Sequence, residues 1–286
     1  MKITLSNTAK KLCVIGDPVT HSKSPLIQNA MCQELELDYV YLCQPVKPEG
    51  LGKFLAGAKA LGYAGFNATM PFKELLIPYL DELDPLAAKL QAVNTVCIKD
   101  GKLYGYNTDC PGYVAALKAG GFDPKGKNIL LLGAGGAAKA VALGLAQAGA
   151  LSIAVANRTT QKARAVVDLI PEVGKVVGWD IATLKEEAVR CDLLVNATSL
   201  GMAGQGAFED LSFLEVLPRE ALVSDLIYHP AQTELLKRAA QLGHTAVNGL
   251  PLLMHQAILA LEHFTGQTIP VSTVVPVLEE LLTQGV

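Results

Sequence analysis

The chain has 286 residues, of which 50% are hydrophobic and 18% are charged, and its formal net charge is −3. This length and composition allow a sizeable buried core, and roughly 100–200 residues per domain suggests one or two domains. There is no basic excess to neutralise phosphates, which argues against a dedicated nucleic-acid binder.

The cysteine pattern and the termini bear on the compartment. Six cysteines are scattered without a CxxC pair, so we expect reduced thiols in a cytoplasmic protein. Residues 1–12 lack the apolar core of a signal peptide, and no stretch reaches the roughly 20 apolar residues that span a bilayer. We therefore expect no membrane partner. The five histidines show no metal-ligand spacing, so we also expect no metal.

In the first part of the chain, short apolar strands alternate with helical patterns, which is typical of an α/β protein with parallel sheets. The predicted strands cover residues 12–15, 39–42 and 65–68, and the predicted helices cover 25–35, 51–61 and 71–80. A hairpin follows, with strands at 95–99 and 102–106 around Asp100-Gly101. We assign residues 1–110 to an α/β domain.

A helix at 111–119 leads into a second unit. Its predicted strands are at 128–132, 152–156, 193–196, 222–225 and 245–247. The helices predicted there run from the turn after 132 to about 148, from about 160, over 252–264 and over 276–282. We assign residues 111–248 to a dinucleotide-binding domain of Rossmann type and 249–286 to C-terminal helices.

The clearest motif lies between a predicted strand and a predicted helix. Gly133, Gly135 and Ala138 fit the pattern GxGxxA. Gly133 permits a tight turn, Gly135 lets the backbone approach a pyrophosphate at the helix N-terminus, and Ala138 lets helix and strand pack closely. The alternative is a glycine-rich turn with a purely structural role.

The end of the next predicted strand reads Asn157-Arg158-Thr159. An NAD-specific site would place an acid here to bind the ribose hydroxyls. Arg158 can instead stack on adenine and attract a 2′-phosphate, which favours NADP over NAD. The alternative is a solvated arginine that opens a helix.

Three loops of the first domain each carry polar residues between a strand and a helix that begins near a proline. Ser22 and Ser24 precede Pro25 and could hold a carboxylate, although Ser24 could instead cap the helix. Such hydroxyls suit a small polyhydroxylated acid better than an apolar ligand.

The other two loops supply a lysine and an acid. Lys73 follows Asn67-Ala-Thr-Met-Pro-Phe in a first helical turn, where the helix dipole favours the neutral amine and a role as a base. Alternatively, Lys73 is a surface lysine paired with Glu74 or another acid. Asp109 is either a helix N-cap or the partner that orients Lys73, and Asn94 could add an amide to the same cleft.

Together these segments closely resemble the shikimate dehydrogenase family. The matching segments occur in order across nearly the whole chain: Ser22-Lys-Ser24, Asn67-Ala-Thr-Met-Pro-Phe-Lys73, Ala92-Val-Asn-Thr95, Asn107-Thr-Asp109, Gly133-Ala-Gly-Gly-Ala-Ala138, Asn157-Arg-Thr159, Asn196-Ala-Thr-Ser-Leu-Gly-Met202, Asp225-Leu-Ile-Tyr-His-Pro230, Asn248-Gly-Leu250 and His255-Gln-Ala257. The resemblance implies a substrate-binding α/β domain, a Rossmann-type NADP-binding domain and C-terminal helices that return to the first domain.

The resemblance also implies an activity: an oxidoreductase that acts on a CH–OH group and reversibly reduces 3-dehydroshikimate to shikimate with NADPH, in chorismate and aromatic amino-acid biosynthesis. It implies that Lys73 and Asp109 form the catalytic pair. The substrate-binding residues that it implies are Ser22, Ser24, Thr69, Lys73, Asn94, Asp109, Tyr228 and Gln256. The NADP(H)-binding residues that it implies are Ala134, Gly135, Gly136, Ala137, Asn157, Arg158, Thr159, Thr198, Ser199, Met202, Leu226 and Gly249.

Several alternatives stay open at this point. Cys110-Pro111 and Pro251 stand where the family commonly has glycine, and Ala68 stands where it commonly has valine, which leaves domain closure and the strictness of substrate choice undecided. A quinate/shikimate or aminoshikimate dehydrogenase is the nearest rival enzyme, and a catalytically silent ligand sensor is a rival of another class. The family resemblance allows a monomer or a homodimer, and either member of the catalytic pair could transfer the proton.

Overall fold

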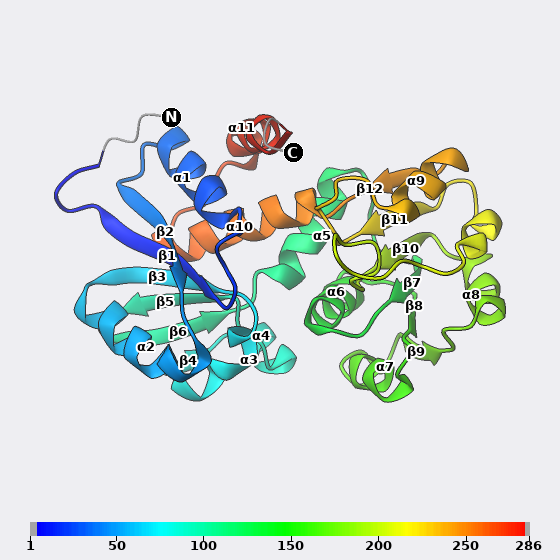
Figure 1. The fold of residues 1–286 in the computed structure, drawn as a ribbon, viewed down its shortest axis with the longest axis horizontal. Helices are drawn as coiled ribbons and strands as arrows, with labels where there is room; N and C mark the ends of the chain where they lie inside the picture. Colours follow the sequence, from blue (N-terminus) through cyan, green and yellow to red (C-terminus); the bar gives the residue numbers. More distant parts are fainter. Residues whose placement is uncertain (1–4, 284–286) are drawn as a thin grey trace. The chain divides into compact units, whose positions relative to one another are not determined.

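The computed structural model describes residues 5–283. These divide into two compact units, one up to Thr108 and again from Gln256 onward, the other Asp109–His255 (Figure 1). The sequence predicts boundaries after residues 110 and 248. The second boundary of the structure lies inside one continuous helix, α10 (Leu250–Thr265), which no change of sequence pattern marks.

The first unit is built on a six-stranded sheet in the order β2-β1-β3-β5-β6-β4. Its strands are β1 (Lys10–Gly16), β2 (Tyr39–Pro45), β3 (Tyr63–Ala68), β4 (Glu82–Leu83), β5 (Thr95–Lys99) and β6 (Lys102–Tyr106). Its helices are α1 (Ser24–Glu34), α2 (Leu51–Ala60), α3 (Phe72–Leu75), α4 (Pro85–Leu90), the later part of α10 and α11 (Val271–Thr283), with 3-10 turns at Pro48–Gly50 and Ile77–Tyr79.

This sheet is mixed, whereas the pattern of alternating elements predicts parallel sheets. Strand β1 pairs in parallel with β2 and β3, but β5 runs antiparallel to both of its neighbours, β3 and β6. The reversal brings the start of β5 to the same sheet edge as the end of β3, with Asn67 opposite Thr95.

Helices cover both faces of this sheet. Phe66 packs in a core cluster with Leu55 of α2, while the neighbouring Gly65 faces α10, because successive strand residues point to opposite sides. A Cβ at Gly65 would lie 2.7 Å from the ring of Phe264, so only glycine lets α10 approach this closely. Figure 1 shows α2 on one side of the sheet and α10 on the other.

The helix predicted over 71–80 is wrong in extent. The structure has the short α3 (Phe72–Leu75) and then a 3-10 turn at Ile77–Tyr79. Pro78 lacks the backbone N–H that an α-helix would need at that point, which explains the break. Lys73 nevertheless lies in the first turn of a helix, as predicted.

The second unit has a parallel six-stranded sheet in the order β12-β11-β10-β7-β8-β9, the doubly wound order of a Rossmann-type domain. Its strands are β7 (Asn128–Leu132), β8 (Ser152–Ala156), β9 (Gly174–Val177), β10 (Leu193–Asn196), β11 (Leu222–Asp225) and β12 (Thr245–Val247). Its helices are α5 (Asp109–Ala119), α6 (Gly136–Gln147), α7 (Thr160–Val167), α8 (Ile181–Ala188), α9 (Glu234–Gln241) and the start of α10, with a 3-10 turn at Ser212–Val216. The α/β fold class predicted from the sequence is confirmed.

The core of this unit follows the strand alternation. Leu130 and Leu132 of β7 face α8, α9 and the 3-10 turn in one cluster. Ala138 of α6 is fully buried, as expected for the alanine that lets the helix pack against the sheet.

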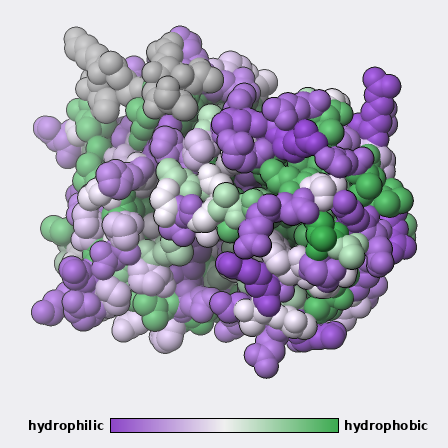
Figure 2. Space-filling model, turned by 45° about the vertical axis from the view of Figure 1, so that its right-hand side comes forward, coloured by the Kyte–Doolittle hydropathy of each residue, from purple (hydrophilic) through white to green (hydrophobic). Residues whose placement is uncertain are grey.

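The face of the molecule in Figure 2 is mostly hydrophilic, with hydrophobic residues interspersed and most frequent toward the right of the view. Among residues 5–283, no helix is both long enough and apolar enough to cross a bilayer. All six cysteines are free thiols, and five of them are buried.

Candidate functional site

The serine pair follows β1 and opens α1. The Oγ atom of Ser22 accepts a hydrogen bond from the backbone N–H of Ser24 at 3.2 Å. Helix α1 begins at Ser24, its N-cap position is Lys23, and no side chain caps it. The alternative that Ser24 is the N-cap is therefore wrong. Both serines are half-buried at one end of the sheet.

Thr69 and Lys73 follow β3 at the same sheet edge. Backbone bonds fix them: Thr69 N–H donates to the Ile15 carbonyl at 3.0 Å, and Val93 N–H donates to the Lys73 carbonyl at 2.8 Å. A Cβ at Gly16 would lie 2.5 Å from the Thr69 methyl group, so the end of β1 packs directly on this side chain. Lys73 is half-buried.

Asn94 stands at the start of β5, where the antiparallel pairing brings it to the same edge. Its Oδ1 accepts from Thr108 N–H at 2.8 Å and from Thr95 Oγ1 at 2.9 Å, and its Nδ2 donates to Thr108 Oγ1 at 3.0 Å. The side chain is buried, with 3% exposed. Asn94 thus fixes the residue that precedes Asp109, a role that the resemblance did not include.

A buried hydrogen-bond chain continues from Asn94 across the sheet. Asn67 Nδ2 donates to Thr95 Oγ1 at 2.9 Å, and Tyr41 O–H donates to Asn67 Oδ1 at 2.7 Å. Sequence reasoning missed Tyr41, Thr95 and Thr108 as members of this edge. Thr95 and Thr108 lie inside quoted motifs, whereas Tyr41 lies on an ordinary apolar strand with no signal of its own.

The remaining substrate candidates lie on other elements. Asp109 is the first residue of α5 and of the second unit, so its carboxylate stands in the first helical turn. Tyr228 follows β11 in the same unit, and burial raises the pKa of its hydroxyl. Gln256, on α10, is half-buried in the first unit.

The glycine-rich turn connects β7 and α6 as predicted. Gly133 has φ +111°, and a Cβ there would lie 2.8 Å from the Ala197 backbone. Gly135, the N-cap residue, and Gly136 are exposed, and a Cβ on either would meet no atom within 4 Å. Gly133 therefore serves the fold, while the protein's own packing does not demand the other two glycines.

This turn fits a dinucleotide. No side chain caps α6, so the first backbone N–H groups of the helix face outward beside exposed Gly135, Gly136 and Ala137. A pyrophosphate is the usual ligand of such a helix N-terminus. Ala134, which precedes them, is buried with 8% exposed.

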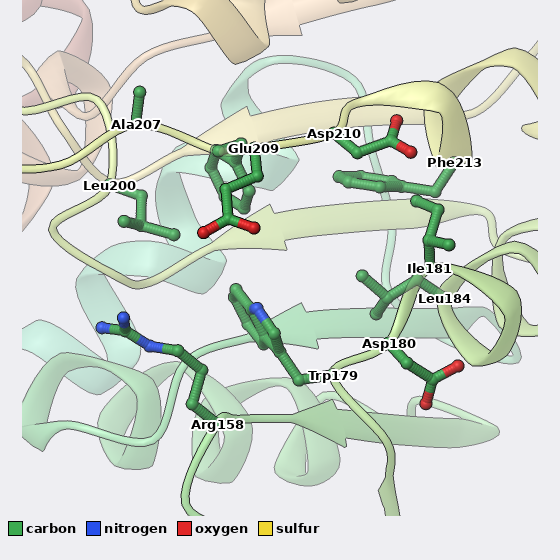
Figure 3. Close-up of a pocket in the computed structure, with 11 residues that line it drawn as sticks. Arg158, Trp179, Asp180, Ile181, Leu184, Leu200, Ala207, Glu209, Asp210 and Phe213 are labelled. Carbon is green, nitrogen blue, oxygen red and sulfur yellow. The ribbon is translucent and has the colours of Figure 1, made fainter.

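Asn157, Arg158 and Thr159 follow β8. Asn157 Nδ2 donates to the Thr159 carbonyl at 3.0 Å, and Thr159 occupies the N-cap position of α7 without using its hydroxyl as a cap. Arg158 is exposed and borders a cavity of about 500 Å³ (Figure 3). The cavity is also lined by Trp179, Asp180, Ile181, Leu184, Leu200, Ala207, Phe208, Glu209, Asp210 and Phe213.

The cavity has a flat aromatic wall, and its charged lining residues are one cation, Arg158, and three acids, Asp180, Glu209 and Asp210. Trp179 and Phe208 are nearly parallel, with ring centroids 6.2 Å apart. In Figure 3, Glu209 lies above the Trp179 ring and Arg158 lies to its left. A planar base beside Arg158 would find an aromatic surface next to it.

The other cofactor candidates follow β10, β11 and β12. Thr198 Oγ1 donates to Asn196 Oδ1 at 2.7 Å, while Ser199 and Met202 are exposed or half-exposed on the same loop. Leu226 follows β11, and a Cβ at Gly249 would lie 2.1 Å from its carbonyl oxygen. The structure thus brings Leu226 and Gly249 into direct contact. No cluster of metal-ligating side chains occurs among residues 5–283.

Comparison with known proteins bears on the family. Residues 14–96 match the model of the shikimate dehydrogenase substrate-binding domain, and residues 115–203 match that of shikimate/quinate 5-dehydrogenase. The shikimate dehydrogenase (NADP(+)) of Alkaliphilus metalliredigens is 39% identical over 95% of this chain and 96% of its own. The chain belongs to the shikimate dehydrogenase family. The predicted family, oxidoreductase class and NADP cofactor are confirmed at this level.

Solved structures of similar proteins include several activities. Shikimate 5-dehydrogenase from Thermus thermophilus, in complex with NADP(H) and shikimate, is 34% identical with a TM-score of 0.83 over 97% of this chain and 100% of its own. Quinate dehydrogenase from Corynebacterium glutamicum, in complex with NAD, is 34% identical with a TM-score of 0.83 over 93% and 97%. A 5-ketofructose reductase from Gluconobacter is 33% identical with a TM-score of 0.86 over 96% and 100%.

Proposed function

We propose that this chain catalyses the reversible NADPH-dependent reduction of 3-dehydroshikimate to shikimate, a step of aromatic amino-acid biosynthesis. The observation that carries the proposal is the sheet edge of the first unit, where Ser22, Thr69, Lys73 and Asn94 follow or precede neighbouring strands. Hydroxyls, an amide and a cation suit a polyhydroxylated acid.

In the proposed reaction, Lys73 and Asp109 form the catalytic pair. NADPH, when bound, supplies the hydride that adds to the C3 carbonyl carbon of the substrate. Lys73 donates a proton to the carbonyl oxygen as negative charge develops there, and accepts it back in the reverse direction. Asp109 orients Lys73 and the substrate hydroxyls.

The proposed binding roles divide along the substrate. Ser22 and Ser24 bind its carboxylate, with Tyr228 near the same group. Thr69, Asn94 and Gln256 bind ring hydroxyls. The interior hydrogen bonds of Asn94 support a second role for it, because the same amide fixes the chain before Asp109.

The proposed cofactor roles divide along NADP(H). The residues assigned to the pyrophosphate are Ala134, Gly135, Gly136 and Ala137. Asn157, Arg158 and Thr159 take the 2′-phosphate and the adenine, and the cavity beside Arg158 supports this by offering an aromatic wall. The residues assigned to the nicotinamide end are Thr198, Ser199, Met202, Leu226 and Gly249.

The assay that tests the activity follows NADP+ reduction with shikimate at the nicotinamide absorbance band, with quinate and NAD+ as paired alternatives. We expect turnover with shikimate and NADP+ that exceeds every other pairing. Turnover chiefly with quinate or NAD+ would overturn the specificity inferred from Arg158. A folded protein that binds NADP+ but turns over no pair would contradict the enzyme assignment and favour a sensing role.

We also propose that the enzyme is cytoplasmic and is a monomer or a homodimer. Six free thiols support a reducing compartment. Light scattering of the purified chain, coupled to gel filtration, distinguishes the two assembly states from each other and from a larger oligomer.

A further inference from the structure

Asp225 is a buried carboxylate at the end of β11 that the reaction scheme does not use. Its exposed fraction is 0%. Asn196 Nδ2 donates to its Oδ1 at 3.0 Å, Ile227 N–H donates to the same oxygen at 3.0 Å, and Thr233 Oγ1 donates to its Oδ2 at 2.7 Å. The three donors are neutral, so the stabilisation of this acid comes from hydrogen bonds.

The first of these bonds leads to the loop after β10. Asn196 Oδ1 accepts from the backbone N–H and from the Oγ1 of Thr198, at 3.0 and 2.7 Å. Thr198 Oγ1 in turn accepts from Leu200 N–H at 3.1 Å. Asp225 fixes the amide group of Asn196, and Asn196 fixes the conformation of residues 197–200.

The second bond leads to the loop after β11 and from there to β12. Ile227 N–H is held by the carboxylate, and the Ile227 carbonyl accepts from Gly249 N–H at 3.0 Å. Leu226 lies between Asp225 and Ile227 in the chain, and its N–H donates to the Asn196 carbonyl at 2.9 Å. The carboxylate therefore fixes the backbone on both sides of Leu226 and, through it, Gly249.

The third bond anchors the start of α9. Thr233 is the N-cap residue, and its Oγ1 accepts from Leu236 N–H at 3.4 Å while it donates to Asp225. A Cβ at Gly201 would lie 3.2 Å from the Thr233 Cβ, so the far end of the β10 loop packs on the same residue.

A carboxylate accepts from all three donors at once. An asparagine at position 225 could rebuild most of this network, because its oxygen could accept from the two N–H donors while its NH2 group donated to the Thr233 hydroxyl, which can also accept. Burial raises the pKa of Asp225, while the bonds from Thr233, Ile227 and Asn196 oppose that shift. The network therefore depends on two acceptor positions in a buried site, and a substitution that removes both of them leaves three donors unsatisfied.

We propose that Asp225 is a positioning residue that holds the loops carrying Thr198, Leu226 and Gly249 in the arrangement that receives the nicotinamide end of NADP(H). The inference rests on the proposed cofactor assignment. It adds to that assignment a single buried group that organises three loops.

The test compares two ligands of the same protein. NADP+ carries both the adenosine and the nicotinamide end, whereas 2′,5′-ADP carries the adenosine and the 2′-phosphate alone. In Asp225→Ala, which removes both acceptor oxygens, we expect calorimetric affinity for NADP+ to fall about tenfold or more, since a small misplacement of binding groups has large effects. Affinity for 2′,5′-ADP should fall much less, because the network reaches the Arg158 cavity only through Leu200 and the glycine turn only through the Ala197 backbone beside Gly133.

A second readout needs no ligand. Hydrogen–deuterium exchange of the Asp225→Ala apo protein should speed up at Thr198 and Ile227 and stay unchanged in α6. The matched control is Asp168→Ala, which removes an exposed carboxylate from the same unit and should change neither affinity nor exchange.

The outcomes separate the positioning role of Asp225 from the proposed function of the protein. Equal losses for NADP+ and 2′,5′-ADP would reduce Asp225 to a general structural role, and wild-type affinity for both would also overturn the proposal. If Asp225→Ala does not fold, Thr233→Val keeps the carboxylate and removes one donor, and wild-type NADP+ binding by that variant would overturn the proposal as well. A wild-type protein that binds neither ligand would instead refute the proposed function.

Discussion

Two adjacent residues of the first unit, Val93 and Asn94, form hydrogen bonds to the Lys73 backbone and to the residue before Asp109. Val93 N–H holds the Lys73 carbonyl at 2.8 Å, and the next residue, Asn94, holds the amide of Thr108 at 2.8 Å, one residue before Asp109. The proposed catalytic pair thus depends on backbone contacts that ordinary substitution of either side chain leaves in place.

Lys73→Ala and Asp109→Ala should each lower kcat by about 10²–10⁴-fold, the usual contribution of a positioned acid or base. KM for shikimate should change much less than kcat, and thermal unfolding should be close to wild type. Lys53→Ala, which removes an exposed lysine of α2, is the control and should keep wild-type kcat. Steady-state kinetics with shikimate and NADP+ checks this, and wild-type kcat in either active-site variant would end the assignment.

At the scale of elements, the turn between β7 and α6 separates two uses of glycine. Gly133 has a positive φ and abuts the Ala197 backbone, whereas Gly136 has neither constraint and opens the helix. The turn therefore offers one position where the fold demands glycine and another where only a ligand would.

Gly133→Ala should lower the free energy of unfolding by about 1–3 kcal/mol, because it combines a strained φ with a backbone clash. Gly136→Ala should leave the apo protein as stable or slightly more stable, since alanine is the better helix former, yet weaken NADP+ binding by crowding the pyrophosphate. Chemical denaturation and calorimetry measure the two effects. Unchanged NADP+ affinity in Gly136→Ala would argue against a pyrophosphate at this turn.

Strands bounded by turn signals were the most predictable elements. The strands at 95–99, 102–106 and 128–132 have the predicted bounds because Gly, Asp or polar residues mark both ends. No predicted element corresponds to β9 (Gly174–Val177), whose four residues are all half-buried and mixed in character, or to α8 and α9. Short elements at a sheet edge owe their form to packing, which local pattern does not contain.

The candidate site was predictable only in part, for a related reason. Motifs point to Lys73 and to the glycine turn because those residues are adjacent to helix starts. The bonds from Asn196 to Asp225 and from Tyr41 to Asn67 join residues 29 and 26 positions apart, and no local spacing announces them. The sequence allows Ser24 as the N-cap of the first helix, but in the structure Lys23 holds that position and Ser24 is the first helical residue.

For the whole molecule, two imidazoles on α10 contribute to the pH dependence of stability: His255, which is buried, and His263, which is half-buried. Burial lowers the pKa of His255 and His263 below the ordinary value of 6.5. Around His263, the acids Asp84 and Glu262 oppose this shift and Lys99 adds to it. Below about pH 6.5 the unfolded chain binds protons more readily than the folded one, so stability is fully present above that pH and is lost as pH falls.

His263→Phe should therefore show a weaker loss of melting temperature between pH 7.5 and pH 5.5 than the wild type. Phenylalanine can keep the stack on Tyr106, whose ring lies 4.0 Å from that of His263, so the variant should fold at neutral pH. Differential scanning calorimetry at both pH values measures the difference. His21→Gln, at an exposed position, is the control, and an unchanged pH dependence in His263→Phe would refute the linkage.

The chain contains one tryptophan, and it stands in the wall of the cavity beside Arg158. Every photon of indole fluorescence that the protein emits therefore originates at one known place in the second unit. If the adenine end of the cofactor enters that cavity, the emission will be quenched on binding, and reduced cofactor will accept excitation energy from the same ring. The molecule thus carries an optical reporter of its proposed cofactor site, without any label.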